Sequence, residues 1–388
     1  MTVITDSSEA AAFCKRLRQT DTVTVDTEFM RERTYWPILC LIQLAGADEA
    51  AAIDPRADGM DLEPLFALMR DTSVLKVFHA GRQDLEIFYH LTGEVPHPIF
   101  DTQVAGMVCG FGEQISYEQL ARRLAGAQID KGSRFTDWCR RPLTQKQIDY
   151  AIADVTHLRT IYEKLARQLK KNKRTAWLRE EMDVLTSPET YAIDLREVWR
   201  RIKVRGAKPR QLAVLREIAA WREETAQKRD VPRNRIMKDD VLVQIATQQP
   251  TNREDLARVR MLPGGLANNA DGKALIEAVA RGIAVPKDDA PLKESNGRPE
   301  QEPPAGLVDL LKTLLRAKAE QAGVASKLVA NMADVERLAA EDDPDSPLMK
   351  GWRYEIFGAD AVKLKRGELA LSADASGLKI IDLSASKT

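Results

Sequence analysis

Cysteine is scarce in this chain, and the few cysteines stand far apart. The 388 residues include Cys14, Cys40, Cys109 and Cys139 and no other cysteine. Single cysteines at such spacings match neither a disulfide framework nor the CxxC pairs of a structural zinc site. We therefore expect four reduced thiols in the core or at the surface, with no part in catalysis.

Long apolar runs are also absent. No stretch approaches the roughly 20 apolar residues that a membrane-spanning helix needs, and the start, MTVITDSSEA, has no cationic segment leading into an apolar one. A composition of 44% apolar and 30% charged residues is typical of folded proteins with proper cores. We expect a soluble, cytoplasmic protein of two or three domains.

An excess of charge of either sign is missing too. Fifty-eight basic residues balance fifty-eight acidic ones, so the net charge gives no reason to expect nucleic acid as a ligand. Basic side chains nevertheless crowd residues 164–174 and 196–210. A one-sided basic surface and ordinary solvated helix faces explain this distribution equally well.

The first part of the sequence alternates short β-like runs with helical stretches. Residues 22–25, 38–44, 50–53 and 74–78 are β-branched or continuously apolar and end at turn residues. Helical spacing is found in 62–69, 83–91, 102–108, 117–124 and 145–169. The first three strands follow one another too closely for helical crossovers, which predicts an antiparallel meander within a mixed sheet flanked by helices.

Strand signals end near residue 191, and most of the remaining chain has helical spacing. Residues 208–283 predict several short helices, including 211–229, 238–247 and 253–258. Residues 287–306 are rich in proline and charge, as solvated linkers are. Helical spacing resumes in 307–324, 326–331, 332–340 and 349–357, and the tail 368–386 alternates weakly like a strand. We expect domains at 1–195, 207–286 and 306–388, with 287–305 as a linker.

The strongest chemical signal is VDTEF, in which Asp26 and Glu28 interrupt an apolar strand. Residues two apart on a strand point to the same face, so these carboxylates converge. Like charges beside a buried strand repel each other unless a cation lies between them, and hard divalent cations such as Mg²⁺ prefer oxygen ligands. Alone, a DxE on a strand is a weak signal.

Three further residues indicate a metal site only in combination with Asp26 and Glu28. Asp84 lies in the first turn of a helix, where it would stabilise the helix N-terminus as readily as bind a metal. Tyr150 and Asp154, in YAIADVTHL, are four residues apart and share one helix face, as chance pairs on amphipathic helices also do. Each element alone has a structural explanation.

In combination, these residues resemble the DEDDy exonucleases, which have a ribonuclease H-like fold. The segments VDTEFMRERTYWPILCLIQLA, FHAGRQDLEIF, FDTQVAGMVCG and SRFTDWCRRPLTQKQIDYAIADVTHL resemble the ribonuclease D family and cover most of the first 170 residues. Residues 208–283 resemble its HRDC domain, and the part after Gly306, with GWRYEIFG, looks like a divergent second copy. The expected fold is an α/β ribonuclease H-like exonuclease domain followed by two small all-α HRDC-like domains.

The resemblance implies removal of nucleotides from RNA 3′ ends by two Mg²⁺ or Mn²⁺ ions, with release of nucleoside 5′-monophosphates. The implied metal ligands are Asp26, Glu28, Asp84 and Asp154. Tyr150 would orient the attacking water. The histidine-containing branch of the superfamily would have its histidine at Asp149, so the tyrosine branch is favoured.

The resemblance also suggests contacts and partners. Candidate substrate-binding residues are Phe29, Met30, His79, Gln103, Arg140 and Arg141. Phe29 and Met30 are explained equally well as core residues, and Trp138 is better explained as a packing anchor. Lys131 and Arg134 are further cations of the same block. We expect RNA 3′ ends, with tRNA precursors as the family substrate, to be the partner of a monomer.

Two other functions remain open. A proofreading exonuclease acting on DNA would use the same acids, because two-metal hydrolysis needs no 2′-hydroxyl. A non-catalytic RNA-binding protein would be a decayed nuclease, although all four acids and the tyrosine are present. The HRDC-like region favours RNA over DNA.

Overall fold

The computed structural model describes residues 3–129, 132, 136–292, 303–341, 344–375 and 377–383. The chain divides into two compact units. One consists of Met1–Glu28, Cys40–Thr190 and Ser295–Thr388, and the other of Phe29–Leu39 and Tyr191–Glu294. Lys131 and Arg134 lie outside the described residues.

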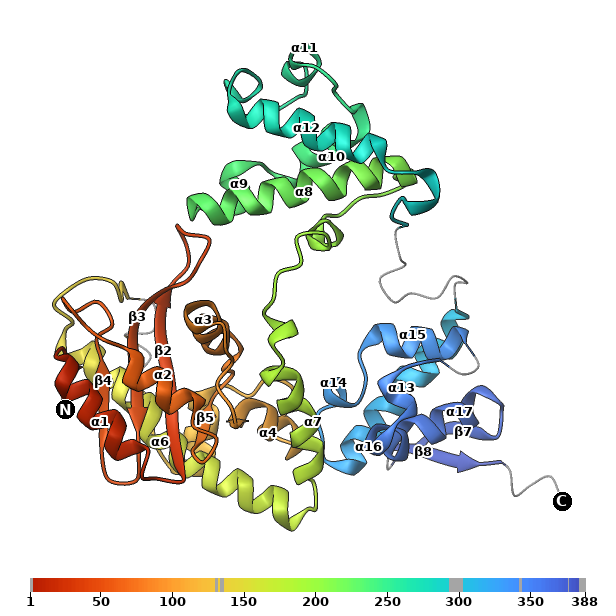
Figure 1. The fold of residues 1–388 in the computed structure, drawn as a ribbon. Coiled ribbons are helices and arrows are strands. Elements are labelled where there is room, and N and C mark those ends of the chain that lie inside the picture. The colour runs from red at the N-terminus through yellow and green to blue at the C-terminus, as the bar shows by residue number, and fades with distance from the viewer. Residues whose placement is uncertain are drawn as a thin grey trace. The chain divides into compact units, whose positions relative to one another are not determined.

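A six-stranded sheet has the order β1-β4-β3-β2-β5-β6. Its four central strands, β4, β3, β2 and β5, are labelled in Figure 1. Its strands are β1 (Val3–Ile4), β2 (Thr22–Met30), β3 (Ile38–Ala45), β4 (Ala50–Ile53), β5 (Leu75–Phe78) and β6 (Ile99–Asp101). Strand β4 runs antiparallel to β3 and parallel to β1, whereas β5 is parallel to both β2 and β6. The expected mixed sheet is confirmed, with the three meander strands as neighbours.

The register of the parallel strands brings their carboxyl ends to one edge of the sheet. Thr24 pairs with Val77, and Phe78 pairs with Asp101. Open α/β sheets bind ligands at the carboxyl ends of their strands. Asp26 lies two residues beyond Thr24, so the DxE pair belongs to this edge.

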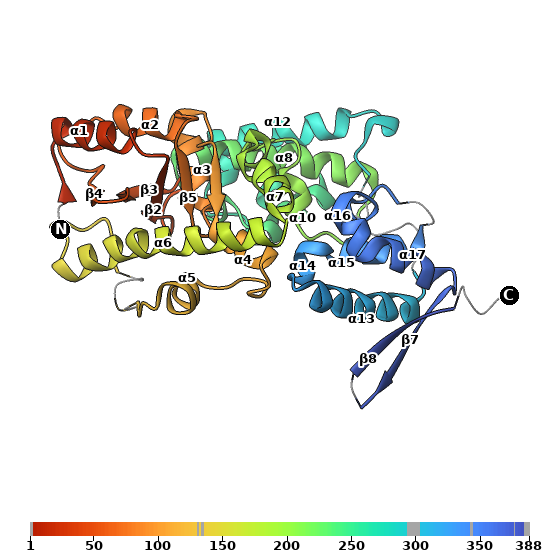
Figure 2. The same cartoon turned by 90° about the horizontal axis from the view of Figure 1, so that it is seen from below.

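Helices cover both faces of the sheet. They are α1 (Ser7–Leu17), α2 (Glu63–Arg70), α3 (Arg82–Thr92), α4 (Thr102–Val108), α5 (Tyr117–Leu120) with a π-helical turn at Ala121–Ala125, α6 (Gln145–Lys171) and α7 (Thr175–Thr186). In Figure 2, α1 and α2 lie on one side of the strands and α6 lies along the other. The expected helices 62–69, 83–91, 102–108 and 145–169 are confirmed to within two residues at each end.

Helix α6 has 27 residues and carries both Tyr150 and Asp154. Its first turn is closed by a capping box: the Gln147 amide donates to the Thr144 hydroxyl over 3.3 Å, and the Thr144 amide donates to the Gln147 side chain over 3.0 Å. Val155 and other apolar residues on one stripe are fully buried. Burial of this stripe determines which face of α6 lies against the sheet.

Two of the cysteines are joined. Cys40 on β3 and Cys139 in the loop before α6 form a disulfide, with Cα atoms 5.4 Å apart. The expectation of four reduced thiols is wrong for this pair, because its partners are 99 residues apart and meet only through the fold. Cys14 and Cys109 are free and buried. Burial raises the pKa of Cys14 to about 12 and that of Cys109 to about 11, so both stay protonated and unreactive at neutral pH.

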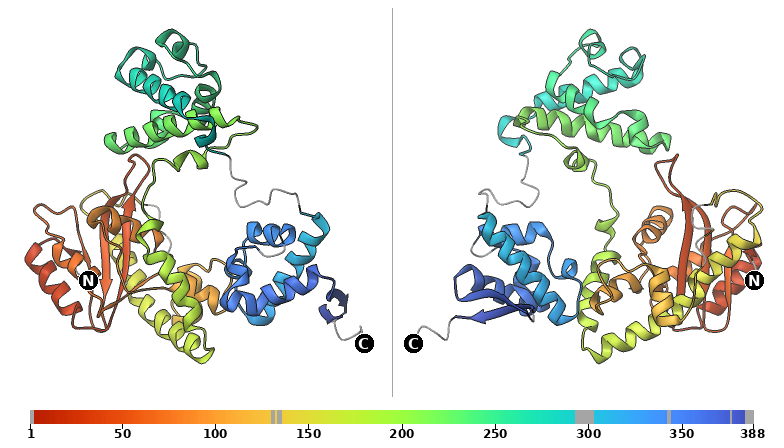
Figure 3. Two further views of the ribbon diagram at one scale, coloured as in Figure 1. Left: turned by 45° about the vertical axis from the view of Figure 1, so that its right-hand side comes forward. Right: turned by 180° about the vertical axis from the view of Figure 1, so that it is seen from behind.

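The last module is helical and ends in a β-ribbon. Its elements are α13 (Ala305–Ala322), α14 (Ser326–Val329), α15 (Met332–Ala340), a 3₁₀ turn at Pro347–Met349, α16 (Gly351–Arg353), a π-helical turn at Tyr354–Gly358, α17 (Ala359–Lys365), β7 (Leu369–Asp374) and β8 (Gly377–Asp382). Strands β7 and β8 pair antiparallel, at the blue end of the chain in Figure 3. The module is therefore not all-α, and its strand-like tail is a hairpin.

Stacked side chains join this module to α7. Trp177 stacks on Trp352 with ring centroids 4.6 Å apart, Arg174 lies over the Trp177 ring, and Arg353 lies over the Trp352 ring. Trp352 and Arg353 also donate hydrogen bonds to the Glu180 carboxylate, over 3.1 and 2.9 Å. The motif GWRYEIFG thus supplies two residues that dock the module.

The second unit is built from helices α8 (Pro209–Arg229), α9 (Arg233–Ile236), α10 (Asp239–Gln248), α11 (Arg253–Ala257) and α12 (Ala270–Ala284). Helix α12 approaches α8 so closely at Gly282 that a Cβ there would lie 2.4 Å from the Cα of Val214. Only glycine permits this approach. Across the described residues of both units, no helix combines the length and apolarity that crossing a bilayer requires.

The connection between β2 and β3 packs within the second unit. The Asp230 carboxylate accepts hydrogen bonds from the backbone amides of Tyr35 and Trp36, each over 3.0 Å. The Tyr35 hydroxyl donates to the buried carboxylate of Glu223 over 2.6 Å. Residues 29–39 lie within the expected range of the first domain, yet they belong to the second unit, where Tyr35 and Trp36 contact residues that follow Tyr191.

We expect Trp352→Ala to loosen the last module. The change removes a buried ring from the stack and a hydrogen bond to Glu180, and comparable truncations cost about 3 kcal/mol. Thermal unfolding should begin at a lower temperature, and limited proteolysis should be faster. Tyr354→Ala, at a side chain that is 40% exposed, is the control and should behave like the wild type. Unchanged protease resistance of Trp352→Ala would contradict the docking role.

Candidate active site

Three carboxylates from two elements converge at the sheet edge. Asp26 and Glu28 come from β2 and Asp154 comes from α6, and one oxygen of each lies within 4.8 Å of the other two. The two-residue period of the strand places Asp26 and Glu28 on one face. The structure therefore brings together residues 126 positions apart in the sequence.

This crowding is unfavourable without a cation. Burial, and next the negative charge of Asp154, raise the pKa of Asp26 from 3.8 to about 8. Without a metal ion, the site therefore holds a proton at neutral pH. A bound divalent cation would neutralise the negative charge instead. Three carboxylate oxygens at this spacing are the donor set that Mg²⁺ and Mn²⁺ prefer. The residues present fit a metal ion of this kind.

Asp84 lies in the third position of α3 and is buried. Its carboxylate accepts a hydrogen bond from the hydroxyl of Thr27, the residue between Asp26 and Glu28. Burial, and then the charge of Asp26, raise the pKa of Asp84 well above its ordinary value. Asp84 is thus linked to the three-carboxylate cluster through the Thr27 hydroxyl and through the charge of Asp26.

The turn before α3 is held by Asp101, at the end of β6. Its carboxylate accepts hydrogen bonds from the amides of Ala80 and Gly81, over 3.1 and 2.8 Å, and also caps α4. A Cβ at Gly81 would lie 2.5 Å from the Cβ of Phe78, so this turn requires glycine. Asp101 therefore positions the start of the helix that carries Asp84.

Tyr150 lies one helical turn before Asp154, and the two side chains are hydrogen-bonded. Burial, and then the charges of Asp154 and Glu28, raise the pKa of Tyr150 above its ordinary value. The side chain therefore remains a phenol, which donates one hydrogen bond and accepts others. The Trp138 ring lies beside it, with centroids 6.1 Å apart.

Tyr117 is a neighbour of this site that sequence analysis did not single out. Its hydroxyl donates to the carbonyl of Ala153 over 2.9 Å, and its ring packs edge-on against His79. Burial, and then the charges of Asp154 and Asp26, raise its pKa. The contact with α6 joins residues 36 positions apart, and no spacing rule relates them.

His79 and Gln103 line the same region, each with a protein partner. The Thr102 hydroxyl donates to the Phe78 carbonyl over 3.1 Å, so His79 Nδ1, 3.0 Å from that hydroxyl, is the donor of the pair. Burial lowers the pKa of His79 and favours this neutral tautomer. The Gln103 side chain donates to the Ile115 carbonyl over 3.3 Å.

Phe29 and Met30 end β2 and are partly exposed. Phe29 belongs to the second unit, whereas Glu28 belongs to the first. Their contact with a terminal nucleotide stays a prediction. Trp138 is 4% exposed, which confirms its role in packing.

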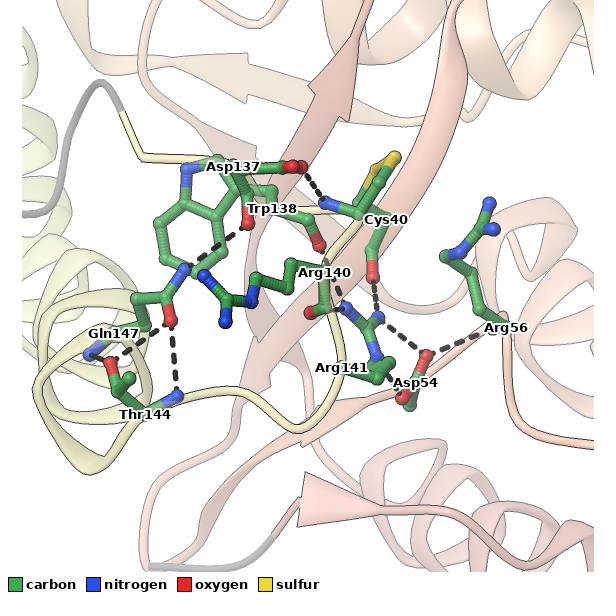
Figure 4. A network of polar contacts seen from close by, with 10 residues as sticks. Cys40, Asp54, Arg56, Asp137, Trp138, Arg140, Arg141, Thr144 and Gln147 are labelled. Atoms are coloured by element: carbon green, nitrogen blue, oxygen red, sulfur yellow. Dashed lines mark hydrogen bonds and ion pairs between the residues drawn. A yellow bond between two sulfur atoms is a disulfide. The ribbon is translucent and has the colours of Figure 1, made fainter.

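The guanidinium of Arg141, a predicted substrate contact, is bonded within the protein. All five of its N–H donors are engaged inside the protein (Figure 4). Nε and Nη2 donate to the Asp54 carboxylate over 2.5 and 2.7 Å. The remaining donors bind the carbonyls of Cys40, Trp138 and Arg140. A guanidinium used in this way holds the loop before α6 on the sheet and has no donor left for a phosphate.

We expect Arg141→Ala to destabilise the fold by about 3 kcal/mol, because it leaves the buried Asp54 carboxylate without its partner. Burial alone would raise the pKa of Asp54, yet the hydrogen bonds from Arg141 hold it below its ordinary value. The stabilisation is therefore present above about pH 4 and lost as the pH falls through the lowered pKa. The difference in unfolding temperature between wild type and variant should shrink in acid. The exposed Arg140→Ala is the control.

We expect Asp26→Asn to raise the unfolding temperature of chelator-treated protein at pH 8. The pKa of Asp26 is about 8 in the folded protein and 3.8 as a free side chain, so ionisation of Asp26 opposes folding as the pH rises. The gain from the uncharged asparagine should shrink as the pH falls from 8 toward 4. Asp149→Asn, at an exposed position of α6, is the control. A variant no more stable than wild type at pH 8 would show that the carboxylates do not repel as described.

Comparison with known proteins places this geometry in a family. Residues 1–170 match the 3′-5′ exonuclease domain family, and residues 211–279 match the HRDC domain. Ribonuclease D of Nitrobacter hamburgensis is 49% identical over 379 residues, which cover 96% of this chain and 97% of that protein. Ribonuclease D of Granulibacter bethesdensis is 49% identical over 380 residues, which cover 98% and 96%.

Comparison with solved structures indicates the same family. The crystal structure of Escherichia coli RNase D matches with a TM-score of 0.81 and 29% identity, and the match covers 94% of this chain and 98% of that one. The catalytic core of RRP6 from Trypanosoma brucei shares the fold, with a TM-score of 0.55 at 21% identity over 72% and 79% of the two chains. DEDDy exonucleases are metal-dependent, and the carboxylate cluster meets that requirement. The chain belongs to the ribonuclease D family of 3′-to-5′ exoribonucleases.

Proposed function

We propose that the chain trims the 3′ ends of tRNA precursors by two-metal-ion hydrolysis and releases nucleoside 5′-monophosphates. The observation that carries this proposal is the convergence of Asp26, Glu28 and Asp154, with Tyr150 hydrogen-bonded to Asp154. Bound Mg²⁺ or Mn²⁺ would supply Lewis-acid stabilisation of the phosphate and lower the pKa of the attacking water.

The acids divide into two ligand sets in this proposal. Asp26, Glu28 and Asp154 would hold one ion, and Asp84 would help to hold a second, through water. The hydrogen bond from Thr27 to Asp84 supports this division, because it occupies one oxygen of Asp84 and leaves the other for a water.

Tyr150 orients the attacking water in this proposal. A phenol with an ordinary pKa near 10 is a poor base at neutral pH, and its hydroxyl proton is directed to Asp154. The phenol oxygen then accepts a hydrogen bond from the water, which fixes the direction of attack. Phe29, Met30, His79, Gln103 and Arg140 are the proposed substrate contacts.

RNA is the proposed substrate because the relatives point to it. The E. coli enzyme is described as an exoribonuclease involved in structured RNA processing. The proposed domains are 1–195 for catalysis, 207–286 and 306–388 for RNA binding, and 287–305 as a linker. A monomeric state and a cytoplasmic location stay predictions.

Purified protein incubated with a 3′-extended tRNA precursor and Mg²⁺ or Mn²⁺ tests the proposal. Chromatography should identify nucleoside 5′-monophosphates released from the 3′ end, with none when a chelator is added. A DNA strand of matched sequence should be degraded more slowly. Faster loss of the DNA would favour the proofreading alternative, and binding of RNA without hydrolysis would favour the non-catalytic one.

We expect Asp26→Ala and Asp154→Asn to abolish hydrolysis while the unfolding transition is retained, because each removes a ligand of the first ion. Tyr150→Phe should lower kcat by at least about 100-fold and keep metal binding, since it loses only the group that orients water. Asp149→Asn, one residue from Tyr150 on α6, should be fully active. Wild-type turnover in either aspartate variant would refute the assignment.

A further inference from the structure

Two hydroxyl groups bracket Asp154. The Tyr117 hydroxyl donates to the carbonyl of Ala153 over 2.9 Å, and the Thr24 hydroxyl donates to the carbonyl of Val155 over 2.8 Å. The two donors come from different elements, α5 and β2. The residues immediately before and after Asp154 are therefore each tied to a separate part of the fold.

These bonds are additional to those that the helix needs. In an α-helix each interior carbonyl already accepts a hydrogen bond from the amide four residues later. The carbonyls of Ala153 and Val155 lie well inside α6 and therefore already accept helical hydrogen bonds. The bonds from the two hydroxyls are not needed to satisfy a buried carbonyl oxygen. A lateral bond to a helical carbonyl instead fixes the rotation of the helix and its distance from the donor.

Thr24 has a particular position in the strand. Because side chains alternate along β2, Thr24 lies on the same face as Asp26 and Glu28. Its side chain is fully buried, and its hydroxyl reaches α6 on the side from which the two carboxylates reach Asp154. The Thr24 bond therefore sets the distance between β2 and α6 at a point two residues before Asp26 on the strand.

We propose that Thr24 and Tyr117 are positioning residues that hold Asp154 at ligand distance from Asp26 and Glu28. This inference rests on the proposed role of Asp154 as a metal ligand. Carboxylates that repel one another move apart unless their backbones are fixed, and residues that orient ligands from outside typically change metal affinity by about 10- to 100-fold. The two hydroxyls supply that fixation from the strand side and from the α5 side.

Isosteric substitutions separate positioning from general stability. Thr24→Val and Tyr117→Phe remove only the hydroxyls, and Thr24→Ser keeps one. For each full-length variant we would measure the unfolding temperature with chelator, the rise in that temperature as Mn²⁺ is added, and the Mn²⁺ dependence of RNA hydrolysis. We expect Thr24→Val and Tyr117→Phe to need about 10-fold more Mn²⁺ in both titrations, and Thr24→Ser to restore the wild-type value.

Matched controls lie nearby. Thr20→Val removes a hydroxyl bonded to the Leu17 carbonyl just before β2, and Tyr162→Phe removes a hydroxyl on α6 that makes no hydrogen bond among the described residues. Both should keep the wild-type Mn²⁺ requirement. If Thr24→Val and Tyr117→Phe only lower the chelator-treated unfolding temperature, with an unchanged Mn²⁺ requirement, the hydroxyls are structural and the inference fails. If Mn²⁺ does not stabilise even the wild type, the proposed metal site itself fails.

Discussion

Repulsion among carboxylates is the constraint around which the first unit is organised. Asp26 and Asp154 lie close enough that burial and mutual charge raise the pKa of Asp26 to about 8. Such an arrangement persists only where the backbones that carry the acids are fixed by other contacts, or where a cation neutralises them. The same repulsion that disfavours the metal-free site strengthens its attraction for a divalent ion.

The fold meets this constraint with short polar contacts from each acid-bearing element. Thr24 ties β2 to α6, Thr27 ties β2 to Asp84, and Asp101 holds the turn that starts α3. All of these contacts lie at the carboxyl ends of parallel strands, where the register brings β2, β5 and β6 together. Arg141 contributes to the same fixation just before α6, because it anchors the loop that leads into the helix.

Periodicity pairs the acids within one element, the family resemblance joins the elements into one site, and neither indicates what holds them. The strand period places Asp26 beside Glu28, and the helix period places Tyr150 beside Asp154, so these pairs can be predicted from the sequence. Tyr117, the Cys40–Cys139 pair and the Arg141–Asp54 pair join segments tens of residues apart, and no local rule relates their partners. The structural role of Arg141 was missed because a sequence shows the charge of a guanidinium and not the partners of its donors. Strands β1 and β6, of two and three residues, are too short for a periodic signal.

The helix also explains why a tyrosine at position 150 fits this site and a side chain at 149 does not. At 3.6 residues per turn, Tyr150 lies about 40° from Asp154 around the helix axis, whereas position 149 lies about 140° away. Asp149 is accordingly exposed and bonded to Gln145, while Tyr150 is half-buried and bonded to Asp154. A histidine at position 149 would reach the carboxylates only if the start of α6 were rotated or unwound. The capping box at Thr144 and the anchoring of the preceding loop by Arg141 oppose such a rotation. The preference for tyrosine in this chain is therefore built into the helix geometry as well as into the residue itself.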